Sequence, residues 1–199
     1  SLAAFSKSLK DEYGVQSVIL GNHVDLDQKI QMTMKGIYQV DPRSLIEEVV
    51  AEDSFAYDAE TLNYLINNGL ILSTSVIEGI IHDTREEDVI KLLVKKIGSL
   101  DGFIVDESRL NYYSDEAAIA LKENGAQILS PEEINFLELK KKLLAGGVNF
   151  EPIDFEDYSM KNKIEIIKFI ETKVDANYTK LNLISANIDA IEMLFPYAI

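Results

Sequence analysis

The chain contains no cysteine, no tryptophan and only two histidines, His23 and His82. Without cysteine it has no disulfide, no thiol nucleophile and no thiolate metal site. Two histidines are too few for a three-histidine metal centre within one chain. The sequence also lacks a P-loop, a Gly-x-Gly dinucleotide fingerprint, a Gly-x-Ser-x-Gly nucleophile elbow and a His-Glu-x-x-His zinc motif. We therefore expect neither zinc chemistry nor hydrolysis by a catalytic triad.

Basic residues are also scarce, because 19 lysines and arginines face 34 aspartates and glutamates, for a net charge of −15. The acidity is spread along the chain. Dividing the sequence after residues 69 and 130 gives 5 basic against 11 acidic residues, 6 against 11, and 8 against 12. No third of the chain is a basic domain, and neutralising phosphates needs clustered lysines and arginines. The composition thus argues against duplex nucleic acid as a partner.

Long hydrophobic runs are missing as well, since none approaches the roughly 18 residues of a membrane-spanning helix. The N-terminal segment from Leu2 to Leu9 is interrupted by Ser6, Lys7 and Ser8, unlike the apolar core of a signal peptide. We expect no membrane span and a cytoplasmic location.

The 199 residues are 47% hydrophobic, which is enough to bury a globular core. Apolar and polar residues alternate from Val24 to Lys35 with Gln28 as the exception, and this two-residue period is typical of a strand with one wet face. Together with the apolar run 15–20 and the turn at Gly36, it predicts an antiparallel meander over about residues 15–40.

The middle of the chain predicts alternating strands and helices. Apolar runs at 70–77, 103–105 and 126–129 are typical of buried strands, and helical patterns separate them. This order favours a parallel, Rossmann-like βαβαβ unit over about residues 70–145. The predicted fold class is therefore α/β, a three-layer mixed sheet that combines this unit with the N-terminal meander.

Several helix starts are marked by capping residues. Asp41, Asp58, Ser114 and Ser130 each precede a helical pattern, and Thr84 with Glu87 has capping-box spacing. After Gly146-Gly147, an extended edge segment over 148–155 and two helices, about 160–174 and 179–195, predict a C-terminal helical hairpin. We expect residues 1–69 to pack with the 70–147 core as one domain, and 148–199 to form a C-terminal subdomain.

Ligands of open α/β sheets bind beyond the carboxyl ends of the parallel strands. In the predicted sheet this edge carries Glu78, His82, Asp83 and Asp106, which are the candidate catalytic residues. Glu78, Asp106 and Glu107 could hold Mg²⁺, because hard cations prefer carboxylate oxygens. Ser73, Ser75, Arg109 and Tyr112 are candidate ligand-binding residues at the same edge. The alternative for each of these residues is a structural role, as a helix cap or a solvated side chain.

Two functions remain open. The first is an interaction or ligand-binding module that docks a protein partner, a second copy or a small molecule. It is favoured by the lack of a complete catalytic motif and by the apolar C-terminal run 193–199. The alternative is a Mg²⁺-dependent phosphoryl-transfer or hydrolytic enzyme that uses the carboxylates named above. Fold class by itself does not decide between them.

Overall fold

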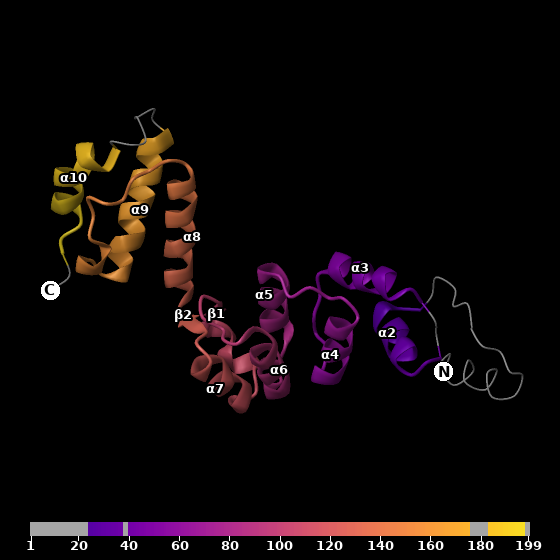
Figure 1. The fold of residues 1–199 in the computed structure, drawn as a ribbon. Helices are drawn as coiled ribbons and strands as arrows, with labels where there is room; N and C mark the ends of the chain where they lie inside the picture. The colour runs from indigo at the N-terminus through magenta and orange to yellow at the C-terminus, as the bar shows by residue number, and fades with distance from the viewer. Residues whose placement is uncertain (1–23, 38–39, 176–182, 198–199) are drawn as a thin grey trace, which may run out of the picture. The chain divides into compact units, whose positions relative to one another are not determined.

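The computed structural model describes residues 24–37, 40–175 and 183–197, and divides them into two compact units. Unit 1 contains the described residues up to Val105 together with Leu110–Gln127, and unit 2 contains Asp106–Arg109 and the described residues from Ile128 onward. Both are built mainly from helices (Figure 1). Within the described ranges, no helix combines the length and apolarity that crossing a membrane would need.

Unit 1 is a series of short helices whose contacts join helices that are adjacent or one apart in the sequence. Helix α2 contacts α3 and α4, α4 contacts α6, and α6 contacts α7. Contacts over such short sequence separations are typical of stacked helical architectures. The core between the helices holds fully buried side chains, among them Leu45, Leu62, Ile80, Ile90 and Leu93. The helices are α2 (Leu26–Met34), α3 (Pro42–Glu52), α4 (Ala59–Asn67), α5 (Thr74–Asp83), α6 (Glu87–Ile97) and α7 (Asp115–Glu123).

Four helices end in the same hydrogen-bonded motif. A glycine with positive φ follows each helix, and the next residue donates its N–H to the carbonyl five positions earlier. In α4, for example, the N–H of Leu70 lies 3.0 Å from the oxygen of Leu65, and both side chains are buried. This Schellman geometry satisfies the last carbonyls and turns the chain back toward the core. The glycines are Gly36, Gly69, Gly125 and Gly147, after α2, α4, α7 and α8.

Unit 2 is built around α8 (Pro131–Ala145), α9 (Met160–Asp175) and α10 (Leu183–Leu194). Helix α9 contacts both α8 and α10, as Figure 1 shows. Their shared core includes Phe136, Phe155, Ile166 and Ile167, and the Phe136 and Phe155 rings meet edge to face at 5.1 Å. The segment between α8 and α9 closes this core with a short 3-10 helix, η2 (Phe155–Asp157).

The predicted α/β fold with its Rossmann-like core is wrong. The only strands in the described part of the chain are β1 (Ile104–Asp106) and β2 (Gln127–Leu129), which form a two-stranded parallel sheet. These two lie where the apolar runs at 103–105 and 126–129 predicted strands. The third predicted strand, at 70–77, is absent because Ser73 caps α5, whose buried face is Val76, Ile77, Ile80 and Ile81.

The predicted meander over 15–40 is also wrong where the structure describes it, since residues 26–34 form α2. Leu26, Ile30 and Met34 are four residues apart, so they fit a helix as well as a strand. Asp25 caps this helix, since its carboxylate accepts a hydrogen bond of 2.8 Å from the N–H of Gln28. Residues 15–23 and 38–39 lie outside the described ranges.

Most of the predicted helix starts are confirmed. Asp41, Asp58, Ser114 and Ser130 each accept a hydrogen bond from the first turn of the helix that they precede. Ser130 and Glu133 form a full capping box. The box predicted at Thr84 and Glu87 is wrong, because α6 begins only at Glu87 and Thr84 instead accepts from the N–H of Glu86. The predicted C-terminal helices correspond to α9 and α10, while 148–155 forms no strand.

Candidate functional site

The two serines predicted to bind a ligand lie at the N-terminal end of α5. The hydroxyl of Ser73 accepts a hydrogen bond of 3.4 Å from the N–H of Val76, and it lies 3.1 Å from the hydroxyl of Ser75. Ser73 is thus a helix cap, the structural alternative considered for it. Both side chains are exposed at this end of the helix.

Glu78, His82 and Asp83, predicted as catalytic residues, all lie on α5. Glu78 is exposed. His82 and Asp83 are brought together at the end of the helix, where Nδ1 of His82 lies 2.8 Å from Oδ1 of Asp83. The other carboxylate oxygen of Asp83 accepts a hydrogen bond of 2.7 Å from the backbone N–H of Phe55. Both oxygens of Asp83 therefore contribute to local structure.

Asp106 ends β1, and Glu107, Arg109 and Tyr112 belong to the 3-10 helix η1 (Glu107–Tyr112). Asp106 accepts hydrogen bonds from the hydroxyl and the N–H of Ser108, at 2.6 and 2.8 Å, and these bonds lower its pKa, with a smaller contribution from Arg109. The side chain of Tyr112 is exposed.

Residues 70–77 form no strand, so Glu78, His82 and Asp83 do not lie at the carboxyl end of a parallel strand. Across the described residues, no three histidine, aspartate or glutamate side chains are arranged to hold a metal ion. The catalytic, ligand-binding and Mg²⁺-binding roles of the named residues stay predictions.

A different site emerges in unit 1, as a hollow of about 270 Å³ beside the N-terminal end of α2. Its polar walls come from α2, the second half of α3 and the loop before α4. Four carboxylates line it and only one ammonium group, so the lining carries a formal charge of −3. The residues are Val24, Asp25, Leu26, Asp27, Lys29, Glu48, Glu52, Ser54, Ala56 and Tyr57.

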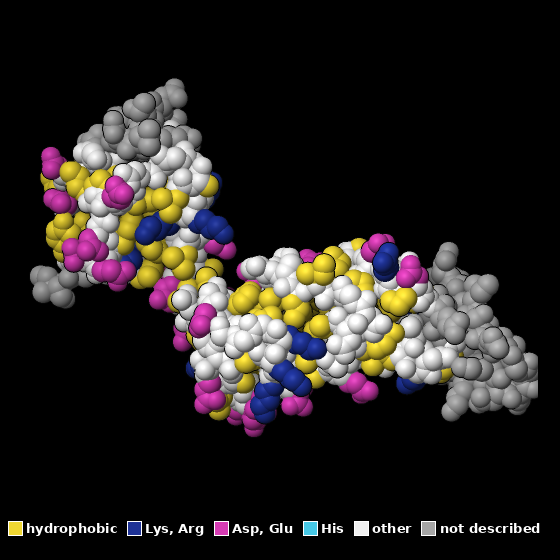
Figure 2. Space-filling model, in the orientation of Figure 1, with side chains coloured by type: hydrophobic (Ala, Val, Ile, Leu, Met, Phe, Trp, Pro, Cys, Tyr) yellow, Lys and Arg dark blue, Asp and Glu magenta, His cyan; other side chains and the backbone are white. Residues whose placement is uncertain are grey.

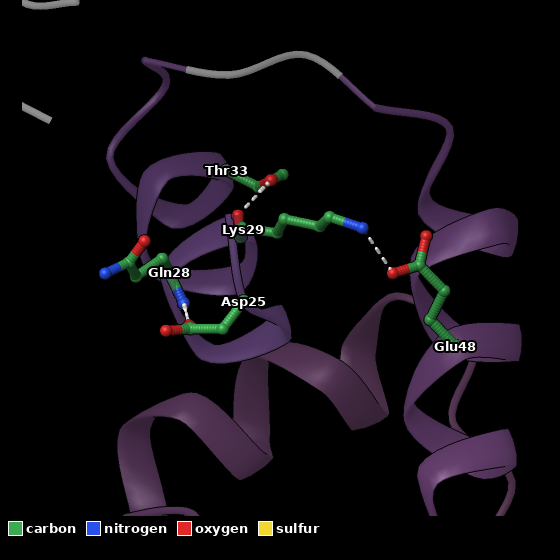
Figure 3. A network of polar contacts seen from close by, with 5 residues as sticks. All are labelled: Asp25, Gln28, Lys29, Thr33 and Glu48. Atoms are coloured by element: carbon green, nitrogen blue, oxygen red, sulfur yellow. Dashed lines mark hydrogen bonds and ion pairs between the residues drawn. The ribbon is translucent and has the colours of Figure 1, made fainter. Parts of the chain in front are cut away.

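The single ammonium group of the hollow is already paired. Nζ of Lys29 lies 2.7 Å from the carboxylate of Glu48, and Figure 3 shows the lysine reaching from α2 toward α3. The carbonyl of Lys29 also accepts a hydrogen bond of 2.7 Å from the hydroxyl of Thr33. The carboxylate of Asp25 is turned toward the N–H of Gln28, where it compensates the positive end of the α2 dipole. Asp27 and Glu52 are the lining acids for which the described residues supply no ion pair.

Tyr57 reports the electrostatics of this hollow. Burial raises the pKa of its hydroxyl to about 12, and the negative charges of Asp27 and Glu52 contribute to the rise. Like charges disfavour the phenolate, so the three side chains share one electrostatic environment. The tyrosine therefore stays neutral in the physiological range and presents both a hydroxyl donor and an aromatic face.

The loop that carries Tyr57 is held against α5 at the adjacent Phe55. The Phe55 ring is buried, and a Cβ atom at Gly79 of α5 would lie only 2.7 Å from it. The N–H of Phe55 is bound by Asp83, as described above. Asp83, predicted as a catalytic residue, thus positions one wall of the hollow.

A second hollow of about 410 Å³ lies between α2 and α4. Its polar groups largely bind one another: the carboxylate of Asp58 caps α4, and Nε2 of Gln31 donates to the hydroxyl of Thr61 at 3.0 Å. Asn67 accepts from Lys96 at 3.3 Å. The smaller hollow has the greater excess of carboxylates and is the better candidate site.

Comparison with protein-family models, with curated proteins and with solved structures finds no match to this chain. Sequence reasoning missed Asp27 and Glu52, because the alternating pattern placed Asp27 on the solvated face of a strand. The cap at Asp25 is the signal that places Asp27 in the first turn of a helix instead.

Proposed function

We propose that this chain is a protein-interaction module whose α2–α3 hollow binds a lysine or arginine side chain of a partner protein. The observation that carries the proposal is the charge of the lining, four carboxylates against one ammonium group that is already paired. A cation that enters the hollow is attracted by the carboxylates of Asp27 and Glu52, and it leaves the ion pair of Lys29 with Glu48 intact. Unit 1, a stack of short helices, supplies the scaffold.

The lining of the hollow favours a ligand that carries an ammonium or guanidinium group. Ammonium and guanidinium groups donate several hydrogen bonds to carboxylates, and they also bind the face of an aromatic ring. Tyr57 supplies such a ring, and its hydroxyl stays protonated because its pKa is about 12. The carboxylates do not form the compact arrangement that a bare metal ion requires. An organic cation on a flexible stem fits them better.

An interaction module is also the class of function predicted from the sequence, and the hollow in unit 1 is its proposed binding site. A cytoplasmic location for the protein is part of this proposal.

The test measures the binding of tetralysine to the full chain by isothermal titration calorimetry at low ionic strength, where exposed charges are least screened. We expect the double variant Asp27→Asn/Glu52→Gln to weaken binding about tenfold, or about 1.4 kcal/mol. The control Glu132→Gln/Glu138→Gln removes the same charge from exposed positions of α8. Affinities reduced equally by the two double variants would contradict the proposal, because net charge alone would then explain the binding.

A further inference from the structure

Helix α10 is apolar on two sides, and only one of them is covered within unit 2. Ile184 and Ile191 are at most 1% exposed, and Ile188 and Phe195 pack against the same core. The Phe195 ring contacts that of Phe169 on α9 at a centroid distance of 6.0 Å. This side accounts for the docking of α10 onto α9.

The second side is exposed. Met193 is 78% exposed, Leu194 53% and Tyr197 48%. With the half-buried Ala190, Met193 and Leu194 follow the helical spacing i, i+3, i+4, and Tyr197 follows just beyond the end of α10; these four residues are called the stripe. A surface helix normally carries polar residues opposite its packed face, so a second apolar stripe is unexpected unless a partner covers it.

The stripe is held in place by contacts at its end. The side-chain amide of Asn162 on α9 donates a hydrogen bond of 2.9 Å to the carbonyl of Pro196. The ring of Tyr197 lies 4.9 Å from that of Tyr158, and its hydroxyl donates to Glu192 at 2.9 Å. The apolar side chains are therefore presented by a defined backbone that a partner can bind without first ordering it.

The charged side chains of α10 have one sign. Asp189 and Glu192 are the ionisable side chains of α10, both exposed, and no lysine or arginine occurs between residues 183 and 197. Figure 2 shows hydrophobic and acidic side chains over the α10 end of unit 2. A second copy docked by the same face would place Asp189 and Glu192 against their own equivalents, at an electrostatic cost.

We propose that the stripe Ala190, Met193, Leu194 and Tyr197 binds an amphipathic helix of a partner protein whose apolar face is flanked by lysine or arginine. The ridge of α10 suits helix-on-helix packing, in which apolar residues of the partner at i, i+3, i+4 and i+7 fill the spaces between its side chains. The flanking bases of the partner pair with Asp189 and Glu192. This surface lies in unit 2 and is independent of the hollow in unit 1.

The probe is a synthetic helical peptide of about five turns, with leucine at positions i, i+3, i+4 and i+7 and lysine elsewhere. A peptide with glutamate in place of lysine is the charge control. Fluorescence anisotropy with the full chain measures both affinities. We expect the leucine–lysine peptide to bind at least about tenfold more tightly than the leucine–glutamate peptide. Equal affinities would overturn the proposed charge selectivity.

Two pairs of variants locate the binding. Met193→Ser/Leu194→Ser changes exposed side chains only, and we expect it to weaken binding of the leucine–lysine peptide about tenfold or more. Leu137→Ser/Leu144→Ser alters two exposed leucines of α8 and is expected to leave the affinity within about twofold. Equal losses from the two pairs would overturn the proposal.

Two further measurements separate this proposal from others. Met193→Ser/Leu194→Ser should leave binding of tetralysine to the hollow unchanged, so the hollow and the stripe are tested separately. Sedimentation velocity of the full chain is expected to show no self-association that depends on Met193 and Leu194. A dimer abolished by Met193→Ser/Leu194→Ser would overturn the proposal in favour of a second copy.

Discussion

The carboxylate of Asp83 accepts the backbone N–H of Phe55, 28 residues earlier in the chain, at 2.7 Å. This bond joins the end of α5 to the loop that lines the hollow. An aspartate in the last turn of a helix is disfavoured by the helix dipole, so the residue is placed at an unfavourable end of α5. Its hydrogen bonds to Phe55 and His82 provide the compensating interaction.

We therefore expect Asp83→Ala to lower the free energy of unfolding by about 1 kcal/mol, because a charge-assisted hydrogen bond to a backbone N–H is lost. Urea denaturation of the full chain measures the change. Glu78→Ala, at an exposed position on the same helix, serves as the matched control and should change stability by less than about 0.5 kcal/mol. Equal effects of the two substitutions would contradict the positioning role of Asp83.

Gly79→Ala is expected to lower the free energy of unfolding, although replacing glycine with alanine inside a helix usually raises it. Alanine in the interior of a helix is normally about 1 kcal/mol more favourable than glycine. In α5 the new methyl group would lie 2.7 Å from the Phe55 ring, so we expect a loss of about 1–3 kcal/mol instead. Thermal or urea unfolding measures it. In the background of Phe55→Ala the penalty should disappear, and a penalty that persists there would show that the ring is not its cause.

Asp58 predicts a pH dependence of stability. Hydrogen bonds from the N–H and side chain of Thr61 lower its pKa below the ordinary 3.8. A carboxyl whose folded-state pKa is lowered adds stability above its unfolded pKa, and this contribution is lost as the pH falls through the folded-state value. Asp58→Asn keeps a capping oxygen but removes the titration. The urea midpoint of this variant should fall less between neutral pH and pH below 3.8. An equally steep fall would contradict the prediction.

The titration of Tyr57 tests the electrostatics of the hollow without any ligand. The difference in ultraviolet absorbance between the chain and its Tyr57→Phe variant isolates this tyrosine among the nine in the sequence. We expect a pKa of about 12, and a lower value in Asp27→Asn/Glu52→Gln, since two negative charges are removed. The pKa should stay above 10.0 because burial is the largest cause of the shift. An unchanged value in the double variant would show that the acids lie too far away to matter.

Local chemistry determined where most helices start. A side chain such as that of Asp58 or Ser130 bonds an N–H only three residues away, so the cap can be predicted from the residues themselves. The glycines after the helices are local signals of the same kind, because a positive φ is costly for other residues. The acidity and the absence of cysteine are likewise properties of the sequence alone.

Tertiary contacts decided what periodicity left ambiguous. Leu26, Ile30 and Met34 fit both a strand and a helix, and the run 70–77 fits both as well, so only burial against neighbouring helices shows which faces are inside. The hollow depends on contacts between distant segments, Lys29 with Glu48 and Phe55 with Asp83, that no local pattern encodes. The exposed stripe at the end of α10 is likewise a result of tertiary structure. Both sides of this helix are apolar in sequence, and which of them is buried depends on the helix that packs against it.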